Sequence, residues 1–376
     1  MKRSGLFIRC IRGAVLSGII GISPACGESP QYSSLHDKST FIRSVEFDLG
    51  SIITMAPGSD NWAITWASDG AQYTTWGDGG GFGGTNSAGR VSMGIARIDG
   101  TVGEFRARNI WGGYDSLVPA QFTGKSYGIL AVGNGLWLWR TGTGSGESAF
   151  RQQDLFFSGD NGKNWQHTGV RFSDADFVGC QPFFAPTFLQ AGPGYSDRPD
   201  NYVYIYSPTV VSEAWDVQVP GEIALIRVPH DSMKSKEEYE YFSGFDEHGN
   251  PGWTRDVCQR ESVYRDDVNG VMRTSVTYNS GLGRYLLVTQ QVSRLRGNGH
   301  MGIYEARTPW GPWKTVLFDS PWRIGLQTGE KSVYWNFSNK WTDKDGKEFA
   351  LVYTGPDSDS FGVVRGRFVI NEDQLR

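Results

Sequence analysis

The chain has 376 residues, with 50 glycines, 14% aromatic residues, 20% charged residues and a formal net charge of −4. Abundant glycine and aromatic residues, without a long apolar repeat of helical period, favour short strands joined by tight turns and very little helix. An acidic chain without a basic stripe argues against a nucleic-acid partner and against a strongly polyanionic substrate.

The N-terminus predicts export. Basic residues precede a short apolar run, Ala14–Ile22, and small residues follow it. The run is too short for a permanent membrane-spanning helix, so residues 1–25 are expected to be a signal peptide. Cys26 suits the lipid attachment of a bacterial lipoprotein, and a plain secretory signal is the alternative. Either signal leads to the periplasm, the cell surface or the medium. Residues 26–42 then predict a polar tether before a domain over residues 43–376.

Residues 59–79 predict a β-hairpin that turns at Asp69 and Gly70. Asp60 and Asp78 each lie nine residues from Asp69, and residues equidistant from a hairpin turn lie side by side in antiparallel strands. The two carboxylates are therefore expected together at one open end, among tryptophans. Such a pair is typical of glycosidases, where one carboxyl is the acid and the other the base or nucleophile. The alternative is two solvated turn residues.

The strand–turn–strand pattern recurs along the chain. In each unit, a run of aromatic and β-branched residues meets a glycine-containing turn, and a second run follows. The five units are Trp62–Trp76, Tyr127–Trp139, Phe184–Tyr206, Thr274–Val288 and Val333–Tyr353. Further strand pairs lie between them, so four strands in each of five units predict an all-β fold, a five-bladed β-propeller. A large β-sandwich is the alternative.

The first strand of each propeller blade lines a central channel, and its first residues surround one mouth. These positions predict the substrate-binding residues beside Asp60 and Asp78, and His300 is added because its glycine-containing segment is expected near the mouth. The predicted substrate-binding residues are Trp62, Lys125, Tyr127, Gln181, Arg273, Ser275, His300, Tyr334 and Asn336. Rings and hydrogen-bonding groups suit a neutral, hydroxyl-rich ligand. Lys125 or Arg273 is expected to hold one carboxylate ionised.

Other motifs point to structure or exclude chemistry. Residues 158–165 fit the Asp-box pattern Ser-x-Asp-x-Gly-x-x-Trp, whose Asp bonds turn amides, and are interpreted as structural. Residues 79–84 are glycine-rich but lack the lysine and helix of a phosphate loop, so a rim loop is expected. The histidines are never at metal-ligand spacing, so no metal or other cofactor is predicted. Cys180 and Cys258 form either a disulfide or two buried free thiols.

The sequence also resembles a known family. The segments that carry the resemblance are 60–62 with 77–79, 91–97, 275–279 with 283–285, 304–306 with 309–313, and 339–341 with 345–347. They resemble bacterial five-bladed propellers formerly of unknown function, the DUF4185 type, which are related to endo-D-arabinofuranan hydrolases and arabinanase-like glycosidases. The resemblance covers nearly all of residues 45–370. It implies that Asp60 and Asp78 match the catalytic acids proposed for the family, whereas Ala63 departs from the proline usual there.

These observations predict an exported, monomeric glycoside hydrolase that cleaves a neutral, furanose-containing polysaccharide of the arabinan type. Asp60 and Asp78 divide the acid and the base or nucleophile roles. The first alternative is a polysaccharide lyase, in which Tyr127 or His300 abstracts a proton and Arg273 neutralises a uronate. The second is a non-catalytic carbohydrate-binding propeller. A membrane partner is expected only through a lipid on Cys26.

Overall fold

Strands make up nearly all the regular structure of this protein. The computed structural model describes residues 32–142, 151–212, 216–292, 299–320, 332–355 and 359–374. The helices in these ranges are short 3-10 turns, namely η2 (Asp174–Asp176), η3 (Pro193–Tyr195), η4 (Lys236–Glu238), η5 (Val257–Gln259), η6 (Asn339–Trp341) and η7 (Glu372–Gln374). None of the helices found there has the length and apolar character needed to cross a membrane. The all-β prediction is therefore confirmed. The predicted signal peptide and Cys26 lie outside the described residues.

The first two sheets are four-stranded antiparallel meanders. The first has the order β2 (Ile64–Trp66), β3 (Gln72–Gly77), β4 (Met93–Thr101) and β5 (Glu104–Trp111). The second has the order β6 (Lys125–Val132), β7 (Gly135–Thr141), β8 (Gln153–Ser158) and β9 (Gln166–Phe172). Consecutive strands pair in both sheets, and the β6–β7 turn consists only of Gly133 and Asn134.

A ten-stranded sheet joins the next two groups of strands. The first group contains β10 (Thr187–Gln190), β11 (Tyr202–Pro208), β12 (Gly221–Pro229), β13 (Glu240–Phe245) and β14 (Pro251–Thr254), with β15 (Ser262–Asp266) paired to β12. The second contains β16 (Thr274–Asn279), β17 (Arg284–Gln291), β18 (His300–Ala306) and β19 (Lys314–Asp319). The two groups meet where β10 and β16 pair in parallel, with Leu189 opposite Val276.

The last sheet brings together the two ends of the folded chain. Its order is β20 (Val333–Phe337), β21 (Glu348–Thr354), β22 (Phe361–Ile370) and β1 (Ile42–Met55). The pairing of β1 with β22 runs from Ile42 opposite Ile370 to Met55 opposite Phe361. Each of the five predicted hairpins is present, as the first strand pair of its group: β2–β3, β6–β7, β10–β11, β16–β17 and β20–β21.

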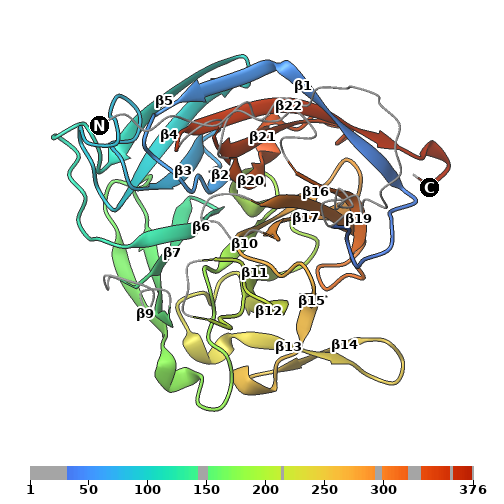
Figure 1. Ribbon diagram of the computed structural model, residues 1–376. Coiled ribbons are helices and arrows are strands. Elements are labelled where there is room, and N and C mark those ends of the chain that lie inside the picture. The colour runs from blue at the N-terminus through green and yellow to red at the C-terminus, as the bar shows by residue number, and fades with distance from the viewer. Residues whose placement is uncertain are drawn as a thin grey trace, which may run out of the picture. The chain divides into compact units, whose positions relative to one another are not determined.

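The first strands of these groups, β2, β6, β10, β16 and β20, surround a common centre and are called the inner strands below (Figure 1). Side chains connect neighbouring inner strands that form no continuous ladder. Thr65 Oγ1 accepts a hydrogen bond from Ala131 N at 2.9 Å, and Gln190 Nε2 donates to Ile129 O at 2.9 Å. These bonds hold β2 and β10 against β6.

Aromatic residues fill the space between the first and last sheets. The ring centroid of Trp62 lies 5.8 Å from that of Trp76 and 5.0 Å from that of Phe361 on β22.

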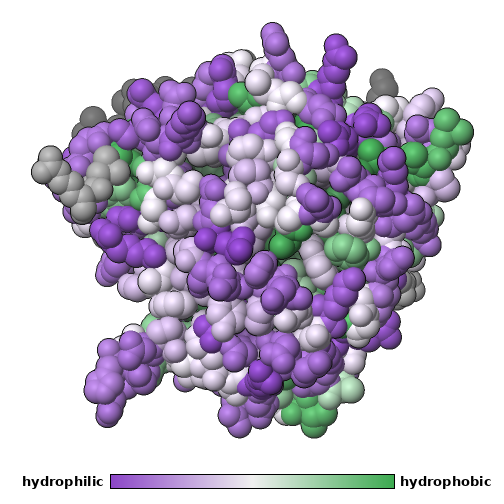
Figure 2. All heavy atoms as spheres, turned by 180° about the vertical axis from the view of Figure 1, so that it is seen from behind, coloured by the Kyte–Doolittle hydropathy of each residue, from purple (hydrophilic) through white to green (hydrophobic). Residues whose placement is uncertain are grey.

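The face of the protein opposite to the view of Figure 1 is mostly hydrophilic, with hydrophobic atoms in small separate groups (Figure 2). The apolar surface on that face is therefore scattered, as on ordinary soluble proteins.

The segment predicted as a tether belongs in part to the fold. Ser39 N donates to Thr315 O at 2.8 Å and Thr315 N to Asp37 O at 2.7 Å, which attaches residues 37–39 to the edge of β19. The His36 ring stacks on Tyr264, with 4.5 Å between centroids. Residues 33–41 are thus held by an available sheet edge, and the folded part begins before the expected boundary at residue 43.

We expect the attachment of residues 33–41 to weaken as the pH falls. Burial lowers the pKa of His36 below its ordinary 6.5, and the charge of Lys314 lowers it further. The charges of Asp266 and Asp37 raise this pKa but do not outweigh burial. The attached state therefore prefers neutral imidazole, so its stability is complete above pH 6.5 and is lost progressively below that value.

Hydrogen–deuterium exchange of residues 33–41 at about pH 7.5 and about pH 5 measures this effect. His36→Phe keeps a ring for stacking and should be equally protected at both pH values. Equal protection of the unmodified protein at both pH values would contradict the prediction.

Candidate active site

The β2–β3 hairpin places Asp60 and Asp78 at the same end, with a register that the symmetry argument missed. Trp66 lies opposite Gln72, as expected. At the open end, however, Asp60 pairs with Gly77 through two backbone hydrogen bonds of 2.8 and 2.6 Å. The shift by one residue coincides with Asn61, whose φ is 58°. Asp78 therefore follows the pair and is not directly opposite Asp60.

Gly77 leaves room for the functional groups above it. A β-carbon at this position would lie 2.7 Å from Asp60 Oδ1 and 3.3 Å from Lys125 Nζ. The Asp60 carboxylate and the Lys125 ammonium group therefore both lie against the backbone of Gly77. Only glycine accommodates both groups without displacement, because every other residue carries a β-carbon.

Asp78 is held between two cations. Lys125 Nζ, from the start of β6, forms an ion pair with Asp78 Oδ1, and Arg90 Nη2 lies 3.3 Å from Asp78 Oδ2. Lys125 is the predicted partner. Arg90 was not predicted, because it lies in the long β3–β4 loop and no motif marks it. The side chain of Asp78 is 38% exposed, so this carboxylate remains accessible from solvent.

Tyr127, Arg273 and Tyr334 belong to the same cluster, from three different inner strands or the residues next to them. Burial raises the pKa of Tyr127 well above its ordinary value; Arg273 opposes this shift, and the charges of Asp60 and Asp78 add to it. The Tyr127 and Tyr334 rings meet edge to face at 5.6 Å, and the Tyr334 hydroxyl donates to Tyr127 O. Arg273 Nη1 donates to Gln290 Oε1 at 2.8 Å, which fixes its position.

Unusual backbone conformations gather at this end of the inner strands. Asn61, Asp78, Ala185 and Tyr334 have φ values of 58°, 54°, 54° and 52°. Residues other than glycine rarely adopt this left-handed region, and such strain is concentrated at functional sites. The backbone therefore marks the same region as the charged cluster.

Three predicted binding residues support the site through internal bonds. Trp62 is completely buried, and its indole N–H donates to Ser59 O and Ser360 O at 3.2 and 2.9 Å. Ser275 Oγ donates to Trp335 O at 2.6 Å, and Asn336 Nδ2 donates to Trp62 O at 3.2 Å. The expected stacking of Trp62 on a sugar is corrected, because its ring has no exposed surface. These side chains hold the inner strands in place.

Gln181 and His300 make contacts other than those of the carboxylate cluster. Gln181 is exposed, and its carbonyl accepts a hydrogen bond from Arg260. The His300 ring stacks on Phe318 of β19, with 5.4 Å between centroids. The predicted roles of both residues in binding stay predictions.

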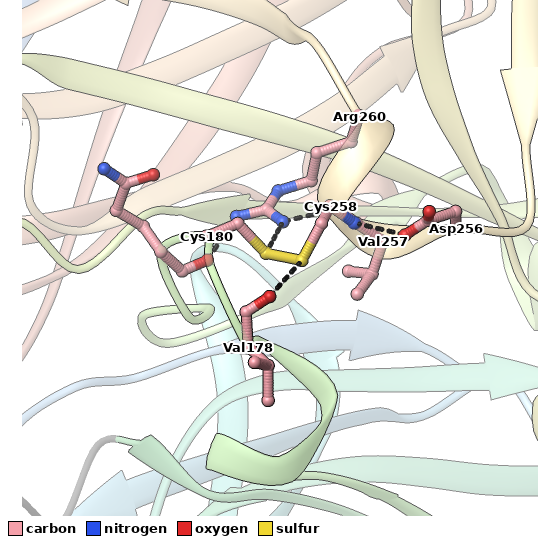
Figure 3. Close-up of a disulfide and its surroundings, with 7 residues drawn as sticks. Val178, Cys180, Asp256, Val257, Cys258 and Arg260 are labelled. Carbon is pink, nitrogen blue, oxygen red and sulfur yellow. Dashed lines mark hydrogen bonds between the residues drawn. A yellow bond between two sulfur atoms is a disulfide. The ribbon is translucent and has the colours of Figure 1, made fainter.

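Cys180 and Cys258 form a disulfide, with 5.5 Å between their α-carbons (Figure 3). This decides between the two alternatives that the sequence left open. The bond joins the segment before β10 to the η5 turn, and Gln181 follows Cys180 directly.

Among the residues that the structure describes, no group of three or more His, Cys, Asp or Glu side chains could hold a metal ion.

The turn at residues 158–165 has internal contacts. Asp160 Oδ1 accepts a hydrogen bond from Asn164 N at 2.9 Å, and Trp165 Nε1 donates to Gly162 O at 2.8 Å.

Two pockets lie away from the carboxylate pair: one of about 610 Å³ between β22 and the β4–β5 turn, and one of about 750 Å³ beside β5. Neither is lined by Asp60 or Asp78. The charged groups, and not these cavities, locate the candidate site.

Comparison with known proteins agrees with the family resemblance. Residues 134–320 match the family model described as DUF4185, Domain of unknown function. The hairpin with Asp60 and Asp78 lies before the matched residues. No curated protein matches the chain.

Solved structures resemble this chain at low sequence identity. A protein from Bacteroides ovatus described as a putative hydrolase has 13% identity and a TM-score of 0.52, with 87% of each chain covered. A GH43_1 enzyme from Xanthomonas citri has 13% identity and a TM-score of 0.48, covering 86% of this chain and 94% of that one. An α-L-arabinofuranosidase from Podospora anserina has 10% identity and a TM-score of 0.47, covering 88% and 98%. The similarity to the Bacteroides ovatus structure shows a shared fold.

Proposed function

We propose that this protein is an exported glycoside hydrolase that cleaves a neutral, furanose-containing polysaccharide of the arabinan type. The observation that carries the proposal is the pair of carboxylates at the end of the β2–β3 hairpin. Asp78 is in contact with two cations, Lys125 and Arg90, and Asp60 lies against Gly77 of the partner strand. Two neighbouring carboxyls, one the acid and the other the base or nucleophile, are what glycosidic bond cleavage needs.

The surroundings favour a division of roles. Asp78 forms ion pairs with Lys125 and Arg90, which hold its carboxylate in position, and we assign it as the base or nucleophile. Asp60 is then the acid, which gives its proton to the glycosidic oxygen as the bond to the anomeric carbon breaks. Asp78 either attacks that carbon or takes a proton from the attacking water. Tyr127, Tyr334 and Arg273 are buried next to the pair.

We infer a five-bladed propeller, with one blade for each inner strand. The contacts of β6 with β2 and β10, and of β16 with β10 and β20, support this arrangement. The pairing of β1 with β22 supports it further, because a strand from the other end of the chain completes the last sheet. The family resemblance supports an arabinan-type substrate, and the N-terminal sequence supports export to the periplasm, cell surface or medium.

The lyase alternative is less well supported. Of its two predicted bases, Tyr127 and His300, Tyr127 is 2% exposed, and burial raises its pKa well above the usual value. A buried phenol of high pKa is a poor base at neutral pH.

Incubation of the protein with a panel of polysaccharides, D-arabinan and L-arabinan included, tests the proposal. We expect new reducing ends from an arabinan and none from the same polymer with the Asp60→Asn, Asp78→Asn double variant. Products that absorb ultraviolet light through unsaturated ends would show a lyase. Polymers that bind without any release over long incubations would show a binding protein, and either result contradicts the proposal.

Gly77→Ala should lower kcat on the order of 100-fold, since a displacement of about 1 Å in a catalytic group has effects of this size. The added β-carbon would displace the Asp60 carboxylate, which is the far end of a side chain, so we expect folding to be retained. Gly103→Ala is the matched control on the same sheet, because nothing lies within 4 Å of a β-carbon there. Equal activity of the Gly77 and Gly103 variants would rule out this position for Asp60.

A further inference from the structure

The two sulfurs of the Cys180–Cys258 disulfide have different surroundings. Cys258 lies on the exposed η5 turn, whereas Cys180 is half-buried. Cys258 Sγ lies 3.7 Å from the carbonyl oxygen of Val178, and the Asp256 carboxylate accepts a hydrogen bond from Cys258 N at 2.9 Å. Cys258 therefore lies beside oxygen atoms that carry negative charge or partial negative charge.

Cys180 lies beside a cation. Arg260 Nη1 is 3.6 Å from Cys180 Sγ, and Figure 3 shows the guanidinium group turned toward this sulfur. The same group donates to Val257 O and Gln181 O, and it lies over the Phe183 ring at 5.1 Å. Within the described ranges, Arg260 forms no ion pair with a carboxylate. Burial is sufficient to lower the pKa of Arg260 from its usual value.

A partly buried cation without a carboxylate partner favours the formation of an anion next to it. Cleavage of the disulfide can supply that anion as the Cys180 thiolate. A neighbouring arginine stabilises a thiolate, and the sulfur with the more stable thiolate is the better leaving group in disulfide exchange. Asp256 and the Val178 carbonyl have the opposite effect on Cys258.

We propose that this disulfide is a directed site of thiol–disulfide exchange, open to small thiols and dithiols at Cys258. The incoming thiolate attacks Cys258 Sγ and forms a new S–S bond with its electron pair. The electron pair of the old bond leaves with Cys180, whose thiolate pairs with Arg260. A second thiolate then attacks the outer sulfur of the mixed disulfide, which leaves Cys258 reduced and the reagent oxidised. The exchange releases the link beside Gln181.

Treatment of the whole protein with reduced glutathione, followed by acid quenching and peptide mass spectrometry, tests the direction of attack. We expect glutathione on Cys258 in about tenfold excess over Cys180, because exchange follows the leaving-group pKa. Arg260→Met should remove most of this preference and slow the reaction. Arg255→Met is the matched control, since Arg255 is 61% exposed on the same segment and pairs with Glu238. Glutathione mainly on Cys180, or an unchanged preference in Arg260→Met, would overturn the proposal.

A second measurement keeps Arg260 in place, so it tests the proposal even if Arg260→Met does not fold. The pH dependence of alkylation of the single thiol left in Cys258→Ser gives the pKa of Cys180. We expect that pKa to lie below the ordinary thiol value of about 8.5. In the Cys258→Ser background, Arg260→Lys should keep the pKa of Cys180 low because it keeps the positive charge, and Arg260→Met should raise it. A Cys180 thiol that titrates at or above the ordinary value in Cys258→Ser would refute the proposed role of Arg260.

Discussion

Asp60→Asn and Asp78→Asn are each expected to lower kcat/KM on the polysaccharide that the protein cleaves by roughly a thousandfold or more. An amide neither gives up a proton as an acid nor serves as a base, while its size is nearly that of the carboxyl it replaces. Reducing-end assays with the purified variants measure the effect. Asp99→Asn is the control on the same sheet, since Asp99 is 47% exposed and bonded to Arg97. Full activity in either site variant would refute the carboxylate pair.

The two variants should also differ from each other if the roles are assigned correctly. A proton donor matters less when the leaving group is already a stable anion. Asp60→Asn should therefore regain much of its activity on an aryl glycoside with a good leaving group, and Asp78→Asn should not.

Lys125→Met gives an independent test of the ion pairs of Asp78. It removes one of the two positive charges in contact with this carboxylate and should lower kcat/KM, because the carboxylate loses a contact that holds it in place. Recovery of Asp78→Asn instead of Asp60→Asn on the aryl glycoside would mean that the roles are reversed, and full activity of Lys125→Met would contradict the role of this ion pair.

Asp154→Asn is expected to destabilise the folded protein by about 3 kcal/mol, because it leaves a buried cation without its partner. The side chain of Asp154 on β8 is completely buried and accepts bonds from Arg140, Arg171 and His167. Arg140 is only 12% exposed. Urea denaturation followed by tryptophan fluorescence measures the change. Asp174→Asn is the control, since Asp174 is 63% exposed and its ion pair with Arg151 should contribute less than about 1 kcal/mol.

The same carboxylate should contribute to acid sensitivity. Burial alone would raise the pKa of Asp154, but hydrogen bonds from Arg171, Gln152, Arg140 and His167 outweigh it and lower the pKa from 3.8 to about 2. The folded state thus holds the proton less tightly than the unfolded state. The contribution to stability, on the order of 2 kcal/mol, is complete above pH 3.8 and is lost as the pH falls toward 2. Asp154→Asn should lack this loss, and equal acid sensitivity of both proteins would contradict the assignment.

Local sequence determined the parts of this protein that depend on short-range physics. Turn residues such as Gly133 and Asn134 fix hairpins because few residues adopt their backbone angles, and strand composition fixes the all-β class. The same reasoning placed Asp60, Asp78 and Lys125 near one another. Its limit was the register, because the backbone at Asn61 shifts the pairing by one residue, and sequence symmetry contains no sign of such a shift.

The tertiary structure decided what depends on contacts between distant segments. Arg90 reaches Asp78 from a loop, β1 completes the sheet of β22, and residues 33–41 occupy the edge of β19. Trp62 is enclosed by Phe361, nearly three hundred residues later, and so supports the site without facing a ligand. These outcomes follow from which surfaces and sheet edges remain to be covered once all strands are in place. That is a property of the whole packed chain, whereas residue types and spacings act over a few positions.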